Sequence, residues 1–333
     1  MVERIGMKST AGKNLIGIDI GGTKTAVIHA KENAGIELID KTVFPTVNVR
    51  DTIENIFSHT GRMMEKHGLN AGNTHAIGIS CGGPLNSRTG VVMSPPNLPG
   101  WDHIPIVKLV EERFDIPCAI QNDANACALA EWKFGAGKGT HNMIFLTFGT
   151  GLGAGLIING KLYSGTNDNA GEVGHIRLAD FGPVGYGKAG SMEGFASGGG
   201  IAQLAKMKLA EKYQMGEIVS WCAREAIETV TAQTVAVHAQ QGDPLAVEII
   251  GISAKYLGAG LAILIDILNP ECIVLGSIYA RNENLFYPLL EEVLKQEALP
   301  PAYRVCQIKP AELGENIGDY AAVSIAGTLD IKH

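Results

Sequence analysis

The chain has 333 residues, of which 46% are hydrophobic and 18% are charged, and its net charge at pH 7 is −7. This acidic balance argues against a nucleic-acid-binding surface, and the longest apolar stretch, Leu257 to Leu268, contains Asp266 and is too short to cross a bilayer. A chain of this length and composition can bury a large core and is expected to form two domains.

The segment before Leu15 is polar with scattered basic residues, so no signal peptide is predicted. The six cysteines stand singly, without a Cys-x-x-Cys pair, which predicts reduced and mostly buried thiols. We therefore expect a cytoplasmic protein that contacts neither a membrane nor nucleic acid.

Short β-branched runs alternate with segments of helical spacing, which predicts an α/β protein. Strands are predicted at residues 15–20, 25–30, 36–43, 75–80, 118–121, 143–148, 154–158 and 272–275. Helices are predicted at residues 51–67, 106–114, 124–134, 200–213 and 243–268, the last as a long buried helix. A Gly-rich stretch at 135–140 separates two well-patterned elements, and we place a domain boundary there.

The first strand runs into a Gly-rich turn, Gly21-Gly22-Thr23-Lys24, and the chain continues as a second strand. Glycines let backbone N–H groups approach a phosphate closely, and Thr23 adds a hydroxyl donor. A P-loop or dinucleotide-binding fingerprint would open into a helix here, so neither is predicted.

A second hairpin on the same plan carries Gly149-Thr150-Gly151 and also continues as a strand. It loosely fits a G-x-G-x-x-A pattern, but the missing helix argues against nicotinamide binding. One Gly-rich hairpin alone is as often a plain tight turn. The presence of two such hairpins instead predicts that both bind the same polyphosphate.

Between the hairpins, a strand ends directly before the helix that contains Asn122-Asp123-Ala124-Asn125. A carboxylate at the carboxyl end of a strand and the start of a helix lies where α/β proteins bind ligands, and the helix dipole favours its ionised form. Asp123 is therefore a candidate general base for a substrate hydroxyl. The alternative is a plain helix N-cap.

Three further segments carry polar side chains that suit sugar hydroxyls. Gly171-Glu172-Val173-Gly174-His175 follows the second hairpin, Glu193 starts a later helix, and Asn97 lies in a Pro-rich loop. Each of these residues could equally be an ordinary loop residue.

Taken together, the segments resemble the ROK family of bacterial sugar kinases and repressors, from about Leu15 to Leu329. The resemblance rests on segments 17–25, 96–101, 122–131, 149–153, 171–175 and 269–276, in that order. It implies a two-lobed actin-like, hexokinase-like ATPase fold, with ribonuclease H-like lobes and a nucleotide in the central cleft. The C-terminal helix would return to the N-terminal lobe, so the expected lobes are 1–133 plus 316–333 and 134–315.

The resemblance also implies roles for individual residues. Asp123 would be the general base, and the sugar contacts would be Asn97, Asn122, Glu172, His175 and Glu193. The nucleotide would be bound by Asp19, Gly21, Gly22, Thr23, Lys24, Gly149, Thr150, Gly151 and Gly276, with Ser277 beside the adenosine. Magnesium would accompany ATP near Asp19.

The chain departs from the family in one segment, where many members hold a structural zinc ion with three cysteines and the histidine that corresponds to His175. Val184, Tyr186 and Ser191 occupy the cysteine positions here. None of them can replace a thiolate as a tight zinc ligand, so we predict no zinc. The loop 180–190 should then be held by packing, through Phe181 and Tyr186.

The predicted activity is ATP-dependent phosphorylation of the primary hydroxyl of a hexose, with glucose as the first candidate. Relatives phosphorylate N-acetylmannosamine, N-acetylglucosamine, allose, fructose or β-glucosides, and some use polyphosphate as the donor. The other class within the family is a sugar-sensing regulator. Only fourteen residues precede Leu15, too few for a winged helix-turn-helix, so a regulator of this length would act without binding DNA. A homodimer is expected from the family.

Overall fold

The structure, a computed structural model, describes residues 12–329. The chain divides into two compact units, which we call the first unit (Met1–Ala130 with Glu315–His333) and the second unit (Glu131–Gly314). The expected lobes, 1–133 with 316–333 and 134–315, have limits close to these. Each unit is built on a five-stranded sheet of its own.

The sheet of the first unit has the strand order β3-β2-β1-β4-β7. Its strands are β1 (Lys13–Ile20), β2 (Lys24–Glu32), β3 (Ile36–Pro45), β4 (Thr74–Cys81) and β7 (Cys118–Asn122). The first three strands form an antiparallel meander, whereas β4 and β7 run parallel to β1. The carboxyl ends of β1, β4 and β7 therefore meet at one edge, which is where the first hairpin and Asp123 lie. Short strands β5 (Leu85–Asn86) and β6 (Val91–Val92) form a separate ribbon.

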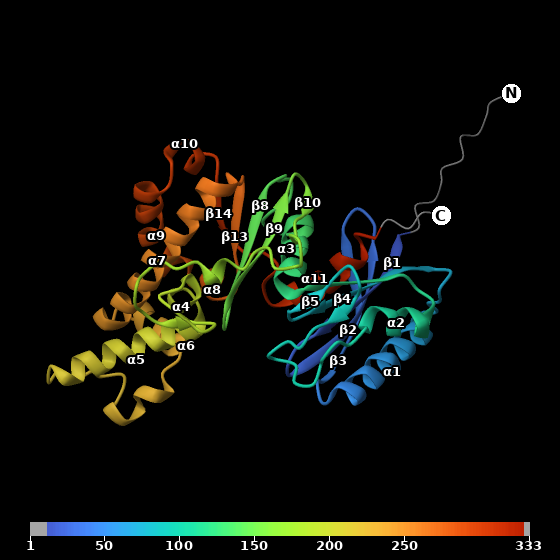
Figure 1. Ribbon diagram of the computed structural model, residues 1–333, viewed down its shortest axis with the longest axis horizontal. Helices are drawn as coiled ribbons and strands as arrows, with labels where there is room; N and C mark the ends of the chain where they lie inside the picture. The colour runs from blue at the N-terminus through green and yellow to red at the C-terminus, as the bar shows by residue number, and fades with distance from the viewer. Residues whose placement is uncertain (1–11, 330–333) are drawn as a thin grey trace. The chain divides into compact units, whose positions relative to one another are not determined.

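Helices cover both faces of this sheet (Figure 1). Helices α1 (Val49–His67) and α2 (Ile106–Phe114) pack on the face that carries Ile16, Ile18 and Ile20. Helix α11 (Ile317–Ala326) packs on the other face against β1 and β4, as expected for the C-terminal helix. It approaches so closely that a methyl group on Gly17 would lie 2.9 Å from Ala322 Cβ.

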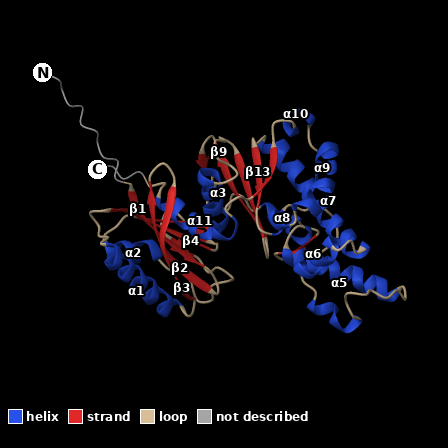
Figure 2. Cartoon of the chain, turned by 180° about the vertical axis from the view of Figure 1, so that it is seen from behind, coloured by secondary structure: helices blue, strands red, loops and turns tan. Residues whose placement is uncertain are grey.

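The sheet of the second unit has the order β10-β9-β8-β13-β14. Its strands are β8 (Met143–Phe148), β9 (Leu152–Ile158), β10 (Lys161–Leu162), β13 (Cys272–Leu275) and β14 (Gln307–Pro310). Its helices are α4 (Met192–Phe195), α5 (Gly198–Gln214), α6 (Ala232–Gln240), α7 (Pro244–Leu268), α8 (Ile278–Arg281), α9 (Glu283–Glu297) and α10 (Pro300–Tyr303). Figure 2 shows α5, α6, α7 and α9 gathered in one helical layer.

Helix α7 is the core helix of the second unit, as its composition predicts. It is long and apolar enough to cross a membrane by length and composition, yet 61% of its most apolar window is buried inside the protein. Asp243 accepts a hydrogen bond from Ala246 N at 2.9 Å and so caps its start. The observed limits agree with the predicted helix 243–268, and its N-terminal half faces the core as well as its C-terminal half.

All six cysteines are free, and five of them are buried while Cys127 is partly exposed. This confirms the expectation from their single spacing. Burial raises the pKa of Cys81 and Cys306 to about 12, so neither thiol is activated.

Candidate active site

The first Gly-rich hairpin joins β1 to β2, and Thr46 donates two hydrogen bonds to its carbonyl groups. Gly21 N donates to Lys24 O at 3.0 Å and closes the turn. Thr46 Oγ1 donates to Gly21 O at 2.7 Å, and Thr46 N donates to Thr23 O at 3.0 Å. Hydrogen bonds from within the protein thus satisfy the carbonyl groups of Gly21, Thr23 and Lys24. The residues Thr23 and Lys24 are exposed.

Asn97 lies between this hairpin and the end of β4. A methyl group on Gly22 would lie 2.5 Å from Asn97 O, and one on Gly82 would lie 2.9 Å from Asn97 Oδ1. Both glycines are required because the loop that carries Asn97 passes so close to them. The Asn97 side chain is therefore placed next to the hairpin.

Helix α3 (Asp123–Phe134) begins at the predicted general base. Asn122 Oδ1 accepts from Asn125 N at 2.7 Å, so Asn122 is the residue that caps the helix. Asp123 Oδ1 accepts from the adjacent Ala124 N at 2.8 Å. The plain N-cap interpretation therefore fits Asn122 rather than Asp123.

The pKa of Asp123 is raised, because surrounding protein removes part of the carboxylate's hydration, and this outweighs the hydrogen bond from Ala124 N. The side chain nevertheless keeps a solvent-accessible face. Burial therefore acts against the ionised form that the helix start was expected to favour. A raised pKa suits a group that must accept a proton near neutral pH.

Asp19, at the end of β1, is a second carboxylate of this site. Burial raises its pKa to about 6; a hydrogen bond with Ser80 opposes this, and the negative charges of Asp319 and Asp123 add to it. A methyl group on Gly318 would lie 3.0 Å from Asp19 Oδ2, so the start of α11 covers this carboxylate closely.

The second hairpin joins β8 to β9 and is also held through its carbonyl groups. Gly149 N donates to Gly151 O at 3.1 Å and closes the turn. Gly198 N donates to Gly149 O at 2.7 Å, and Gly199 N donates to Thr150 O at 3.2 Å. The first turn of α5 therefore fixes this hairpin in the way that Thr46 fixes the first one.

Three predicted sugar contacts belong to the second unit. Glu193 Oε2 accepts from Leu152 N at 3.0 Å, directly after the second hairpin. His175 ends a short 3₁₀ helix (Val173–His175), and its ring lies edge-on to Tyr186, with the ring centroids 5.2 Å apart. Glu172 is exposed beside it.

Hydrogen bonds, not aromatic packing, hold the loop 180–190. Phe181 is 78% exposed, so the expectation that it packs was wrong, and Tyr186, which is 70% exposed, lies T-shaped to the His175 ring. Gln203 of α5 accepts from Val184 N at 2.9 Å and donates to Val184 O at 2.8 Å. This two-bond clamp satisfies both backbone groups of Val184, in the hairpin of β11 (Val184–Gly185) and β12 (Lys188–Ala189).

Gly276 and Ser277, the segment expected beside the adenosine, follow β13. Gly276 N donates to Leu146 O at 2.9 Å, which ties the segment to β8. Ser277 has a positive φ of 50°, and a methyl group on Gly149 would lie 3.9 Å from its Oγ. The segment therefore lies beside the second hairpin.

Among residues 12–329, no group of three or more His, Cys, Asp or Glu side chains is arranged to hold a metal ion. A magnesium ion that binds together with a nucleotide needs fewer protein ligands, because phosphate oxygens and water molecules complete its coordination and the protein supplies only one or two carboxylates. Asp19, crowded by the charges of two other carboxylates, fits that role. Tyr186 and Lys188, which contact His175, are not zinc ligands.

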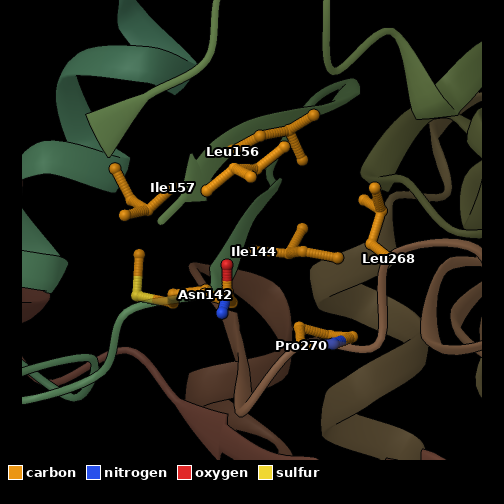
Figure 3. Close-up of a pocket in the computed structure, with 8 residues that line it drawn as sticks. Asn142, Ile144, Leu156, Ile157, Leu268 and Pro270 are labelled. Carbon is orange, nitrogen blue, oxygen red and sulfur yellow. The ribbon is translucent and has the colours of Figure 1, made fainter. Parts of the chain in front are cut away.

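A small apolar pocket lies elsewhere in the second unit (Figure 3). It has a volume of about 30 Å³ and is lined by Asn142, Met143, Ile144, Leu156, Ile157, Ile158, Leu268 and Pro270. Six of these residues lie at the start of β8 or the end of β9, away from the second hairpin, while Leu268 ends α7 and Pro270 lies between α7 and β13. The pocket has room for about one water molecule, and it contains none of the predicted site residues.

The structure thus groups the predicted residues into two sets. The first unit brings together Asp19, Gly21, Gly22, Thr23, Lys24, Asn97, Asn122 and Asp123. The second unit brings together Gly149, Thr150, Gly151, Glu172, His175, Glu193 and Gly276. Sequence analysis missed Thr46, Ser80 and Gln203, because an isolated polar residue carries no motif.

The chain is similar to known proteins over most of its length. Residues 15–328 match the sequence profile of the ROK family. A glucokinase from Streptomyces coelicolor is 33% identical over 318 residues, which cover 95% of this chain and 98% of that protein. A xylose repressor from Caldicellulosiruptor bescii is 30% identical over 305 residues, covering 90% of this chain and 74% of the repressor.

A solved structure extends the comparison to the fold. The ROK family glucokinase from Streptomyces griseus, in complex with glucose and AMPPNP, matches with a TM-score of 0.74 at 29% identity, covering 95% of this chain and 100% of that one. This likeness confirms the hexokinase-like α/β fold class.

Proposed function

The chain belongs to the ROK family, and from this premise we propose that it is a sugar kinase that transfers the γ-phosphoryl group of ATP to the primary hydroxyl of a hexose, with glucose as the first candidate. The likeness to a glucokinase bound to glucose and AMPPNP supports both substrates. The proposal includes a cytoplasmic homodimer with no nucleic-acid partner.

The observation that carries the proposal is the placement of Asp123. Its carboxylate begins α3 at the sheet edge where the first hairpin ends β1, and its cap neighbour Asn122 and the loop residue Asn97 complete this edge. A carboxylate with a raised pKa and a solvent-accessible face can take the proton of a hydroxyl as that hydroxyl attacks phosphorus.

Most of the rate enhancement in phosphoryl transfer comes from positioning and charge neutralisation. The amides of the two hairpins, together with Thr23, Lys24 and Thr150, would bind the polyphosphate. Magnesium, when bound with ATP, supplies charge neutralisation, and Asp19 would be the residue that holds it.

The test is an ADP-release assay with Mg-ATP against a panel of hexoses, N-acetylhexosamines and β-glucosides, with Asp123→Ala as the control. Turnover with one sugar that disappears in the control supports the kinase and identifies the acceptor. Polyphosphate in place of ATP tests the donor in the same assay.

The second candidate is a sugar sensor without kinase activity, favoured by the 30% identity to a xylose repressor. A sensor would bind sugars, seen as a rise in melting temperature, and yet release no ADP with any member of the panel.

A further inference from the structure

We propose that Glu193 is a positioning residue that links occupancy of the sugar site to the shape of the second hairpin, so that sugar and nucleotide bind cooperatively. The inference rests on the proposed function and goes beyond the role of Glu193 as a sugar contact. It is carried by contacts within the second unit.

The first step is the hydrogen bond between the Glu193 carboxylate and the hairpin. Leu152 is the first residue of β9, immediately after the turn, and its N–H donates to Glu193 Oε2 at 3.0 Å. A methyl group on Gly151 would lie 2.9 Å from the same oxygen. The carboxylate therefore lies directly against the turn, where a side chain at residue 151 would press on it.

The second step is that the segment 171–175 packs on the same strand. A methyl group on Gly174 would lie 2.4 Å from Leu152 O and 3.1 Å from Glu193 Cβ. Gly171 O accepts from Ala154 N at 2.9 Å. The backbone that carries Glu172 and His175 is therefore pressed onto β9 and onto Glu193, with no side chain between them.

The third step is the continuation of the chain from Glu193 to α5. Ser191 Oγ accepts from Gly194 N at 3.1 Å and caps α4. A methyl group on Gly200 would lie 2.0 Å from Gly194 O, so α4 and α5 are in tight contact. Gly198 N and Gly199 N then donate to the carbonyl groups of the hairpin. One short segment thus holds the hairpin at both ends, through the Glu193 carboxylate and through two amides.

A carboxylate can accept several hydrogen bonds, and Glu193 Oε1 accepts none from the described residues of the second unit. A sugar hydroxyl that donates to Glu193 would restrict the carboxylate's rotation and strengthen its bond to Leu152 N. The hairpin would then be ordered before the nucleotide arrives. Since coupling between binding sites is reciprocal, the nucleotide must strengthen sugar binding by the same factor, about tenfold for a coupling of ordinary size.

The test measures AMPPNP affinity by calorimetry, with and without saturating glucose, in the wild type, in Glu193→Met and in Glu193→Gln. The methionine variant keeps the length of the side chain and removes both acceptor oxygens, whereas glutamine retains one. In the absence of sugar, we expect Glu193→Met to weaken AMPPNP binding about three- to tenfold, the loss of one charge-assisted bond that orders a loop, and Glu193→Gln to recover part of it. Glu225→Met is the matched control, because it makes the same substitution at an exposed position of the second unit outside the site, and it should leave AMPPNP binding unchanged.

Amide hydrogen exchange gives a second measurement that does not depend on sugar affinity. We expect the Leu152 amide to exchange faster in Glu193→Met than in the wild type, and glucose to slow it in the wild type. Equal AMPPNP affinities without sugar in the wild type and Glu193→Met overturn the inference and leave the kinase proposal standing. A wild-type protein that binds neither glucose nor AMPPNP overturns the proposed function, and the inference with it.

Discussion

Lys41 Nζ lies 2.7 Å from Oδ1 and 2.8 Å from Oδ2 of Asp319, an ion pair between β3 and the first turn of α11. The Asp319 side chain is 7% exposed and the Lys41 side chain 43%. The pair joins positions 278 residues apart, beside the carboxylate of Asp19, whose pKa is lowered by Lys41 and raised by Asp319. It fastens the C-terminal helix to the sheet that carries the first hairpin.

Lys41→Met should destabilise the protein, because it leaves the Asp319 carboxylate buried without a counter-charge. The lysine is partly exposed, so we expect a loss of about 1 kcal/mol in the free energy of unfolding, not the larger penalty of a fully buried pair. Urea unfolding at pH 7 measures it. Adding Asp319→Asn should recover most of the loss, and a double variant as unstable as Lys41→Met would contradict this.

Asp123→Ala should lower kcat by at least ~10²-fold, the scale of lost general-base catalysis, while sugar affinity is largely kept. Asp123→Asn keeps the shape and the hydrogen bond from Ala124 N, and it should lose activity to the same extent. Steady-state kinetics and sugar titration by calorimetry check the two parts. A near-normal kcat in either variant removes Asp123 from the role.

Asp19→Asn should change stability in a pH-dependent way. The pKa of Asp19 is raised to about 6, so its contribution to stability is present below the unfolded value of 3.8 and is lost as pH rises through 6. Asparagine cannot ionise, so it avoids the cost of a buried charge. At pH 7.5 the free energy of unfolding of the variant should exceed that of the wild type by up to about 3 kcal/mol. At pH 4 the gain should be much smaller. Urea unfolding at pH 4 and pH 7.5 measures the difference in the free energy of unfolding between the variant and the wild type. The same difference at both pH values would show that burial does not raise the pKa of Asp19.

Gln203→Ala should loosen the loop 180–190, because both of its bonds to Val184 disappear. We expect a stability loss of about 1 kcal/mol and weaker sugar binding, with AMPPNP binding unchanged. Gln203→Glu is a useful companion, since it can still accept from Val184 N but cannot donate to Val184 O. If both variants bind sugar like the wild type, the clamp does not support the sugar site.

The protein is expected to contain no zinc, because Val184, Tyr186 and Ser191 offer no thiolate. Elemental analysis after dialysis should find far less than one zinc ion per chain, and a strong chelator should leave the melting temperature unchanged. About one zinc ion per chain that survives dialysis would refute this prediction.

The elements near the site were largely predictable because each carries a local signal. The strands at 143–148 and 272–275 have the predicted limits, and α2 does too. Helix α9 was not predicted, since Pro288 interrupts its pattern, and β14 was not predicted because Ile308 is its only residue typical of strands. The motifs also predicted the candidate residues of the site.

What the motifs could not indicate was how those residues are held. The cap role of Asn122, the clamp of Gln203 and the pairing of Lys41 with Asp319 depend on contacts between residues that the fold brings together. The direction of the Asp123 pKa shift likewise depends on how much protein surrounds the carboxylate, which a local pattern does not contain.

The hydrogen bonds that hold the two hairpins differ in how an amino-acid substitution affects them. One bond to the first hairpin comes from the hydroxyl of Thr46, so a single codon change can weaken or remove it. The corresponding bonds to the second hairpin come from the backbone amides of Gly198 and Gly199, which almost every amino acid would supply. Natural variation should therefore readily change how the carbonyl groups of the first hairpin are held, whereas the bonds from Gly198 N and Gly199 N to those of the second change only when the main chain moves.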